Sequence, residues 1–588
     1  MEQNTFECDV LVVGSGASGM STAITAASQG LKVLVVDKEP RFGGTTARSG
    51  GWLWIPGTRL ATEQGIHEPE GAALTYMKHE TTTHFDAARV GAFLDMGPKA
   101  IDFFTRNTCV QFDMPPVFPD YHAEAPGGQQ GGRSMVTRPF DGRELGKRVK
   151  LLAPPLPELT VFGMMLGSGP EIKHFMRAFK SPTSFWYVTK RLTRHFLDVL
   201  GHGRGMTLTN GNALAGRLAK AAMDLDIPVW LSSPVKKLVV EYDGVSGAVV
   251  QHEGKSVRVV AKRGVVLACG GFPYDVERRK QLFPHAPTGR EHYSPSPSTN
   301  TGDGLRLAEA VGGRVDGTIP HAAAWVPASV TTRPDGTKGV MPHFIDRAKP
   351  GVIAVTPKGR RFANEGNSYH DFVQAMVKAC ESDGEPEVTA WLLCDHKALR
   401  NYGLGCVAPA PLPIGRHLKS GYLKRGATVG ELAREIGIAP ATLEATVQEF
   451  NKGARTGDDP AFGKGSKAYN RYQGDANVTP NPCVAPLENG PYYAIRLVVG
   501  DIGTFAGLVT DEKTRVLDAN RQPIKGLYAV GNDAASVMGG NYPGAGITLG
   551  PALTFGYVAG LQLAQAEAAA AVQLKVEQRE AVPVSRKA

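Results

Sequence analysis

The chain has 588 residues, of which 42% are hydrophobic and 21% are charged, and its formal net charge is +9. This composition is typical of a folded globular protein and excludes a disordered one, and the length predicts two or more domains. No run of about 18 or more apolar residues is present, so the sequence predicts no segment that crosses a bilayer.

The cysteines and the N-terminus indicate a cytoplasmic protein. The seven cysteines are scattered, with no C-x-x-C pair and no spacing typical of metal ligands. This usage favours reduced thiols and predicts no metal site. The first ten residues are polar and acidic, unlike a secretory signal peptide.

The N-terminal stretch has the pattern of a dinucleotide-binding unit. Residues 8–13 (CDVLVV) predict a buried parallel strand, residues 14–19 (GSGASG) match G-x-G-x-x-G, and a small-residue helix follows up to Gly30. A second strand, residues 31–36, is followed by Asp37. In dinucleotide-binding units an acidic residue at this spacing hydrogen-bonds to a ribose hydroxyl. The predicted dinucleotide contacts are Gly14, Ser15, Gly16, Ala17, Ser18, Gly19 and Asp37.

The next stretch, residues 38–51 (KEPRFGGTTARSGG), is rich in glycines and hydroxyls and suits a loop that wraps a long cofactor. It resembles the FAD-binding region of the fumarate reductase and succinate dehydrogenase flavoprotein superfamily, which implies FAD. Some members carry a histidine here that bonds covalently to the flavin, whereas this chain has two threonines, so non-covalent FAD is expected. The expected FAD contacts are Lys38, Gly43, Gly44, Thr45, Thr46, Ser49, Gly50 and Gly51.

Later segments predict that the cofactor domain is divided in sequence. Residues 228–240 and 247–260 predict a β-hairpin region, residues 264–271 (GVVLACGG) and 526–532 predict buried strands, and residues 300–304 (NTGDG) open a helix. The expected fold class is α/β: a Rossmann-like FAD-binding domain in two parts, residues 1–297 and 499–588, with an inserted α+β catalytic or substrate domain, residues 298–498. Further predicted cofactor contacts are Val235, Ala268, Gly270, Gly271, Asn300, Gly302, Asp303, Gly531, Asn532, Thr548 and Leu549.

Four blocks narrow the resemblance: FGGTTARSGGWLWIPG from residue 42, PDYHAEAPGGQQGGRSM from 119, GRRFANEGNSYHDFVQAM from 359 and GNDAASVMGGNYPGAGITLGPALTFGYVAG from 531. Over nearly its full length the chain resembles the 3-ketosteroid Δ1-dehydrogenase family. Fumarate reductases place an essential arginine in the last of these regions. None occurs between residues 532 and 560 here, which counts against dicarboxylate reduction.

The resemblance implies a reaction and four catalytic residues. Introducing a C1–C2 double bond into a 3-ketosteroid removes a proton from C2 and a hydride from C1, and enolate charge builds on the C3 oxygen. By resemblance, the Tyr542 hydroxyl and the Gly546 backbone N–H donate to that oxygen, as an oxyanion hole does. Tyr369 is the implied base for the C2 proton, Tyr121 supports its phenolate, and the hydride goes to flavin N5. Free tyrosine has a pKa of about 10, so a base of this kind needs such support.

Residues 147–204 fit no cofactor motif and contain ten Lys or Arg against three acids, among apolar and aromatic residues. Three interpretations remain open for this segment. It is a helical pair that covers the active site, a nucleic-acid surface, or an interfacial segment with apolar side chains in lipid and cations on anionic headgroups. No known nucleic-acid module is present, so a nucleic-acid partner is not expected. The interfacial interpretation places the protein peripherally on the inner membrane.

The predicted function is therefore FAD-dependent 1,2-desaturation of a 3-ketosteroid in bacterial sterol breakdown, with a quinone or an electron-transfer protein as the electron acceptor. Three alternatives remain: a steroid Δ4-dehydrogenase on the same fold, a flavin redox carrier at the membrane surface, and a non-catalytic interaction protein with an FAD fold. The preferred side chain at C17 is not fixed by these motifs.

Overall fold

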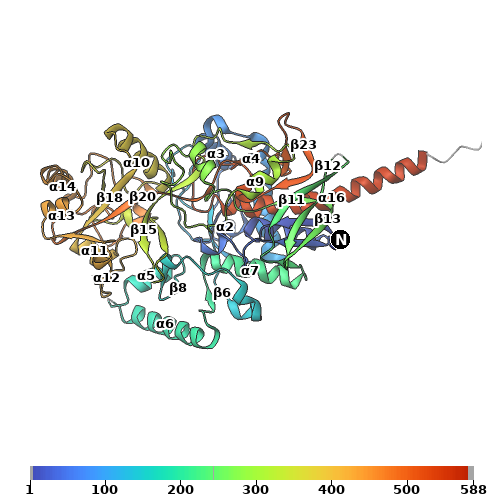
Figure 1. The fold of residues 1–588 in the computed structure, drawn as a ribbon. Helices are drawn as coiled ribbons and strands as arrows, with labels where there is room; N and C mark the ends of the chain where they lie inside the picture. Colours follow the sequence, from blue (N-terminus) through green and yellow to red (C-terminus); the bar gives the residue numbers. More distant parts are fainter. Residues whose placement is uncertain (1–3, 180, 243, 581–588) are drawn as a thin grey trace, which may run out of the picture.

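The structure is a computed structural model that describes residues 4–179, 181–242 and 244–580, with the backbone alone for residues 4, 170 and 566–580. Figure 1 shows two sheet regions side by side, with a long C-terminal helix beside the first sheet. Mixed strands and helices in this arrangement confirm the predicted α/β class.

The first sheet carries the predicted dinucleotide-binding unit. Its central strand β1 (Asn4–Val13) pairs in parallel with β2 (Val33–Val36) on one side and with β13 (Lys255–Leu267) on the other. The order is β10-β2-β1-β13-β12-β11, and β23 (Pro523–Ala529) joins β13 in parallel, with β22 (Arg515–Leu517) alongside. Residues Val10–Val13 of β1 and all of β2 are buried because helices cover this part of the sheet, which explains their continuous apolar sequence.

One strand replaces two that the sequence predicts. The hairpin consists of β11 (Val235–Glu241) and β12 (Gly244–His252), while β10 is only Val229–Trp230. Strand β13 then runs unbroken from Lys255 to Leu267, pairing first with β12 and afterwards with β1 and β23. The predicted break between residues 260 and 264 is wrong, because Gly264 continues the strand where β1 shifts register between Cys8 and Val10. Residues 268–271 follow the strand as a loop.

The second sheet has six strands in the order β16-β15-β20-β18-β17, with β19 also paired to β20. Its strands are β15 (Ala323–Thr332), β16 (Lys338–Pro342), β17 (Val352–Val355), β18 (Thr389–Asp395), β19 (Lys424–Gly426) and β20 (Tyr492–Thr504). Helix α10 (Tyr369–Asp383) packs on β15, and α13 (Val429–Glu435) and α14 (Pro440–Ala454) lie at the far end in Figure 1. The predicted domain boundary between residues 498 and 499 falls inside strand β20. The division into domains stays a prediction.

The basic segment forms a helical pair, α5 (Pro170–Met176) and α6 (Pro182–His202), at the lower edge of Figure 1. The last helix, α16 (Leu549–Glu580), begins at the glycine-rich turn as predicted and packs against α1 (Ala17–Ser28) and α4 (Ala87–Asn107). No helix in the described ranges is long and apolar enough to cross a membrane.

Candidate active site

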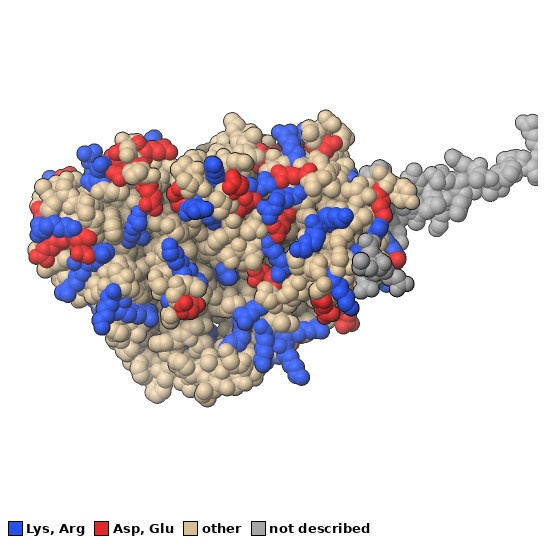
Figure 2. Space-filling model, in the orientation of Figure 1, with Lys and Arg blue, Asp and Glu red and all other residues tan. Residues whose placement is uncertain are grey.

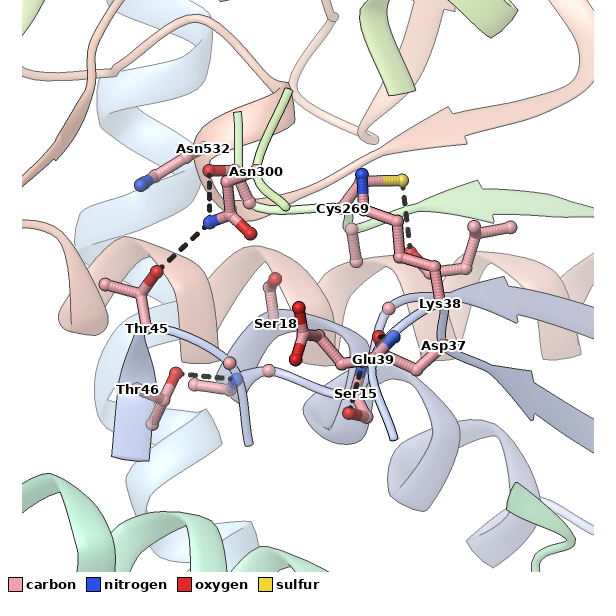
Figure 3. Close-up of a pocket in the computed structure, with 18 of the residues that line it drawn as sticks. Ser15, Ser18, Asp37, Lys38, Glu39, Thr45, Thr46, Cys269, Asn300 and Asn532 are labelled. Atoms are coloured by element: carbon pink, nitrogen blue, oxygen red, sulfur yellow. Dashed lines mark hydrogen bonds between the residues drawn. The ribbon is translucent and has the colours of Figure 1, made fainter. Parts of the chain in front are cut away.

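A cavity follows the carboxyl ends of the first sheet. It begins at the N-terminus of α1 and reaches the N-terminus of α16, so it joins segments from both ends of the chain (Figure 3). The sequence-predicted residues that line it are Gly14, Ser15, Gly16, Ala17, Ser18, Asp37, Lys38, Gly44, Thr45, Thr46, Ser49, Val235, Ala268, Gly270, Asn300, Asp303, Gly531, Asn532, Thr548 and Leu549.

Six predicted contacts lie outside the lining: Gly19, Gly43, Gly50, Gly51, Gly271 and Gly302. Gly19 shows the reason most clearly. A Cβ at this position would lie 2.0 Å from the carbonyl oxygen of Gly14, so the missing side chain lets α1 pack against the turn after β1. Such a glycine supports the cavity wall without facing the cavity, which matches the third glycine's expected role in helix–strand packing.

Hydroxyls and amides tie the cavity walls together. Thr46 Oγ1 accepts from the backbone N–H of Ala17 at 3.0 Å, and the Asn300 side-chain amide donates to Thr45 Oγ1 at 3.2 Å (Figure 3). The loop after β2 is therefore fixed against both α1 and the segment that leads into α9 (Asp303–Glu309). These contacts place polar groups from three distant segments around one elongated space.

Two acids, Asp37 and Glu39, stand at the end of β2. Asp37 accepts hydrogen bonds from the backbone N–H of Ser15 at 2.9 Å and from the Ser15 hydroxyl, and burial raises the pKa of its carboxyl. Glu39 also lines the cavity and accepts from Thr299. Sequence analysis missed Glu39 because the motif assigns one acid only, although a second acid two positions later was visible.

Three predicted catalytic tyrosines meet in the interior, all of them buried. The Tyr121 hydroxyl donates to the Tyr369 oxygen at 3.2 Å. The Tyr542 ring stacks on Tyr121 with centroids 5.6 Å apart and meets Tyr369 edge-on at 4.9 Å. Helix α10 begins at Tyr369, and Ser368 caps it, so the first helical turn fixes the direction of this phenol.

Gly546 lies beside this cluster in a conformation that only glycine adopts readily. Its φ is +100°, and a Cβ would lie 2.5 Å from the backbone of Leu53. Its own N–H is close enough to the Tyr542 phenol to hydrogen-bond and so to oppose the rise in that pKa. The phenol and the amide therefore face one small volume, as the resemblance implies.

A fourth tyrosine, Tyr469, was missed. It lies on the short helix α15 (Ala468–Gln473), and its ring centroid is 4.1 Å from that of Tyr121. No motif marks Tyr469 in the linear sequence, because it reaches the cluster only through the folding of the second sheet region. We define these four residues (Tyr121, Tyr369, Tyr469 and Tyr542) as the tyrosine cluster.

Burial dominates the electrostatics of the tyrosine cluster. It raises the pKa of Tyr542 to about 12 and the pKa values of Tyr121 and Tyr369 well above 10. Burial also raises the pKa of Tyr469, and this rise is opposed by a hydrogen bond with Tyr121 and by the positive charge of the fully buried Arg347. Arg347 is held by backbone carbonyls, including those of His343 at 3.1 Å and Glu365 at 2.7 Å. A phenolate in this cluster would therefore lie in the field of a fixed positive charge.

His370, which follows Tyr369, is a structural histidine. Its Nδ1 accepts from the Trp325 backbone N–H at 3.1 Å and its Nε2 donates to the Gly540 carbonyl at 3.2 Å. Burial lowers its pKa to about 3, so the ring is neutral. It joins β15 to the loop before Tyr542 and does not titrate in the working range of an enzyme.

Comparison with known proteins identifies the cavity. A family model described as an FAD binding domain matches residues 9–549. The chain belongs to this family of flavoproteins. FAD is therefore its cofactor, and the glycine-rich turn, the helix N-termini and the acids at one end of the cavity fit a long dinucleotide.

Individual relatives narrow the class of this flavoenzyme. It is 45% identical over 565 residues to 4-oxocyclohex-2-ene-1-carboxylate 5-dehydrogenase from Sinomonas cyclohexanicum, covering 96% of this chain and 95% of the relative. It is 36% identical over 569 residues to 3-oxosteroid 1-dehydrogenase from Mycobacterium tuberculosis, covering 95% and 98%. The crystal structure of 3-ketosteroid delta1-dehydrogenase from Sterolibacterium denitrificans in complex with 1,4-androstadiene-3,17-dione matches with a TM-score of 0.87 at 37% identity, covering 96% of this chain and all of that one.

The flavoenzyme is thus an FAD-dependent oxidoreductase that acts on CH–CH donors, and the predicted resemblance to 3-ketosteroid Δ1-dehydrogenases is confirmed. Within the described residues, no group of histidines, cysteines and acids could hold a metal ion.

Proposed function

We propose that this flavoenzyme introduces a double bond next to the ketone of a six-membered ring, and that its substrate is a 3-ketosteroid desaturated at C1–C2. The observation that carries the proposal is the buried tyrosine cluster beside the Gly546 amide. A ketone oxygen that receives both the Tyr542 hydroxyl and the Gly546 N–H acquires enolate character. The C2 proton then becomes acidic enough for removal. One such donor contributes roughly 3 kcal/mol to transition-state stabilisation.

Tyr369 removes the C2 proton in this proposal. A buried phenol is a poor base, because burial raises its pKa. The hydrogen bond with Tyr369 opposes the rise in the pKa of Tyr121, and Arg347 opposes the rise in the pKa of Tyr469, so both contacts favour a phenolate within the cluster. Because the phenols are coupled, the charge belongs to the cluster as a whole, with Tyr369 as the member that contacts the substrate. Tyr121 and Tyr469 are positioning residues in this scheme.

The residues that would hold FAD are the predicted contacts that line the cavity. Ser15 to Ser18 would receive the pyrophosphate at the N-terminus of α1, and Asp37 the ribose. Thr548 and Leu549 would hold the flavin end with the N-terminus of α16. FAD supplies the acceptor for the two electrons that leave with the C1 hydrogen. The protein's part is to orient the ketone and to keep water away from the reacting carbons.

A second candidate substrate is 4-oxocyclohex-2-ene-1-carboxylate, which the 45% identity to the Sinomonas enzyme favours. The names of both relatives place the new double bond beside a ring ketone. Both substrates therefore require the same desaturation beside a ring ketone at the tyrosine cluster. They differ in what is attached to that ring, which is an apolar polycycle in the steroid and a carboxylate in the other substrate.

One panel separates these candidates. The purified holoenzyme is incubated with a dye acceptor and, separately, androst-4-ene-3,17-dione, cholest-4-en-3-one, a saturated 5α-3-ketosteroid or 4-oxocyclohex-2-ene-1-carboxylate, and the products are identified by mass spectrometry and NMR. We expect loss of two hydrogens at C1–C2 of the steroids. Turnover of the carboxylate alone would replace the steroid assignment, and a Δ4 product from a 5α-steroid with no Δ1 product would favour the Δ4 alternative. No turnover of any ketone would overturn the proposal.

We also propose that α6 places the enzyme on an anionic membrane surface. Its outward face exposes large apolar side chains, including Trp186 (70% exposed) and Leu200 (84%), while Ser184, His195 and Asp198 face inward. Figure 2 shows this lower lobe as mostly uncharged, with Lys and Arg beside it. Apolar residues flanked by cations suit a lipid interface. A water-insoluble steroid partitions into membranes, so docking would bring the enzyme to its substrate.

A further inference from the structure

A half-buried histidine next to the tyrosine cluster lies between two carboxylates. His122 Nδ1 is 2.8 Å from Glu80 Oε2, and its Nε2 is 2.7 Å from Asp371 Oδ2. An ionised carboxylate only accepts hydrogen bonds, so both ring nitrogens carry protons. Burial lowers the pKa of His122, but the hydrogen bonds to Asp371 and Glu80 outweigh burial and raise it to about 10. His122 is therefore an imidazolium at neutral pH.

Each member of this triad is attached to a segment that carries one tyrosine of the cluster. His122 directly follows Tyr121, and Asp371 lies in the first turn of α10, which begins at Tyr369. The backbone carbonyl of Glu80 accepts a hydrogen bond from the side chain of Asn541, the residue before Tyr542. The triad thus joins three chain segments at the point where each delivers a phenol.

We propose that Glu80, His122 and Asp371 form an ionic clamp that positions Tyr121, Tyr369 and Tyr542 for proton removal from the substrate. The inference rests on the proposed function and adds three positioning residues to it. Tyr121 and Tyr369 lie far apart in sequence, so their 3.2 Å contact depends on tertiary interactions. A shift of about 1 Å in such a constellation can cost on the order of 10²-fold in rate.

The charge of His122 has a second consequence. Asp371 acts on the cluster as a negative charge and raises the pKa of Tyr469. The carboxylate of Glu80 lies on the other side of the His122 ring. His122 offsets both charges, helped at Asp371 by Lys467. Removing only the imidazolium would leave two acids whose charges oppose a phenolate, and it would loosen the contact between the segments of Tyr121 and Tyr369.

The test measures flavin reduction by androst-4-ene-3,17-dione in a stopped-flow instrument, with substrate deuterated at C2 or at C1. The variants are His122→Gln, Asp371→Asn and the double variant. We expect each single variant to reduce its flavin about 10- to 100-fold more slowly, with KM within about threefold. The isotope effect at C2 should rise, because proton removal becomes more rate-limiting. The double variant should be no slower than the slower single one, because the two residues act as a unit.

The control is His396→Gln, an exposed histidine that hydrogen-bonds to Tyr493 outside the cluster, and it should match the wild type. FAD content and Tm are measured for every variant. Wild-type rates and isotope effects in His122→Gln would overturn the clamp. So would a loss of rate that follows lost FAD or a lowered Tm with an unchanged C2 isotope effect, since that shows a structural role only. If none of the ketones reduces the flavin of the wild type, the proposed function is wrong, and the clamp, which rests on it, is wrong as well.

Discussion

The backbone N–H of Tyr121 donates to the carbonyl oxygen of Pro543 at 2.9 Å. The Tyr76 hydroxyl donates to the same oxygen at 2.8 Å. Pro543, which follows Tyr542, is therefore hydrogen-bonded directly to Tyr121. This link uses backbone atoms, so it survives when a tyrosine of the cluster is changed to phenylalanine. Such substitutions test the chemistry of the hydroxyl rather than the fold.

Changing Tyr369→Phe should lower kcat by about 10²- to 10⁴-fold, the range that a general base contributes. The ring remains, so its edge-on contacts with Tyr542 and Tyr121 should persist. Steady-state kinetics on androst-4-ene-3,17-dione measure the effect, and the visible spectrum reports bound FAD. Tyr242→Phe, at a fully exposed position, is the matched control. Turnover close to that of the control would remove Tyr369 as the base.

Changing Gly546→Ala should reduce both activity and stability. A non-glycine residue at a φ of +100° is strained by roughly 1–3 kcal/mol, and the new Cβ would meet Leu53. The turn must then move its N–H away from the ketone oxygen, at a cost of roughly 10²-fold or more in kcat. Thermal unfolding and kcat are measured together. An alanine variant with normal kcat would show that this amide does not contact the substrate.

The double substitution Trp186→Ser and Leu200→Ser should weaken binding to vesicles of phosphatidylglycerol and phosphatidylcholine. Both side chains are mostly exposed on α6, so the fold loses little when they are removed. Vesicle sedimentation at low and high salt measures binding, which should fall with salt because the flanking cations are screened. The control is Tyr242→Ser on the hairpin of the first sheet. Equal sedimentation of the double variant and the Tyr242→Ser control would contradict the membrane proposal. Binding that does not depend on the fraction of anionic lipid would contradict it as well.

The protein should lose stability as pH rises from about 7 to 10, and His122 should account for part of that loss. Its pKa is about 10 in the folded protein and about 6.5 in the unfolded chain. A raised pKa gives a contribution that is complete below the unfolded value and is lost as pH passes the folded value. Urea unfolding of the holoenzyme should show a gap between wild type and His122→Gln that narrows toward pH 10. A gap that does not depend on pH would contradict the ionic contacts.

The cofactor cavity was largely predictable because its signals are local. The turn at Gly14 to Gly19, the acid after β2 and the glycines before α16 each occupy one short stretch, and most of their residues line the cavity. Tyr121, Tyr369 and Tyr542 came from resemblance, since nothing in their spacing shows that they meet. Tyr469 and the clamp residues Glu80 and Asp371 could not be predicted, because their positions depend on how the two sheet regions come together. Strand β13 was divided wrongly because a glycine inside a strand usually signals a break.

The order in which the tyrosines of the cluster occur in the sequence determines when the cluster can form during synthesis of the chain. Its four phenols come from widely separated parts of the chain, and the amide of Gly546 is among the last groups to be added. During translation, a chain that has not reached Tyr542 can hold the glycine-rich turn after β1 but lacks this phenol and the cavity wall that Thr548 and Leu549 form. We therefore expect a polypeptide that ends before Tyr542 to be unable to enclose FAD fully or to complete the tyrosine cluster.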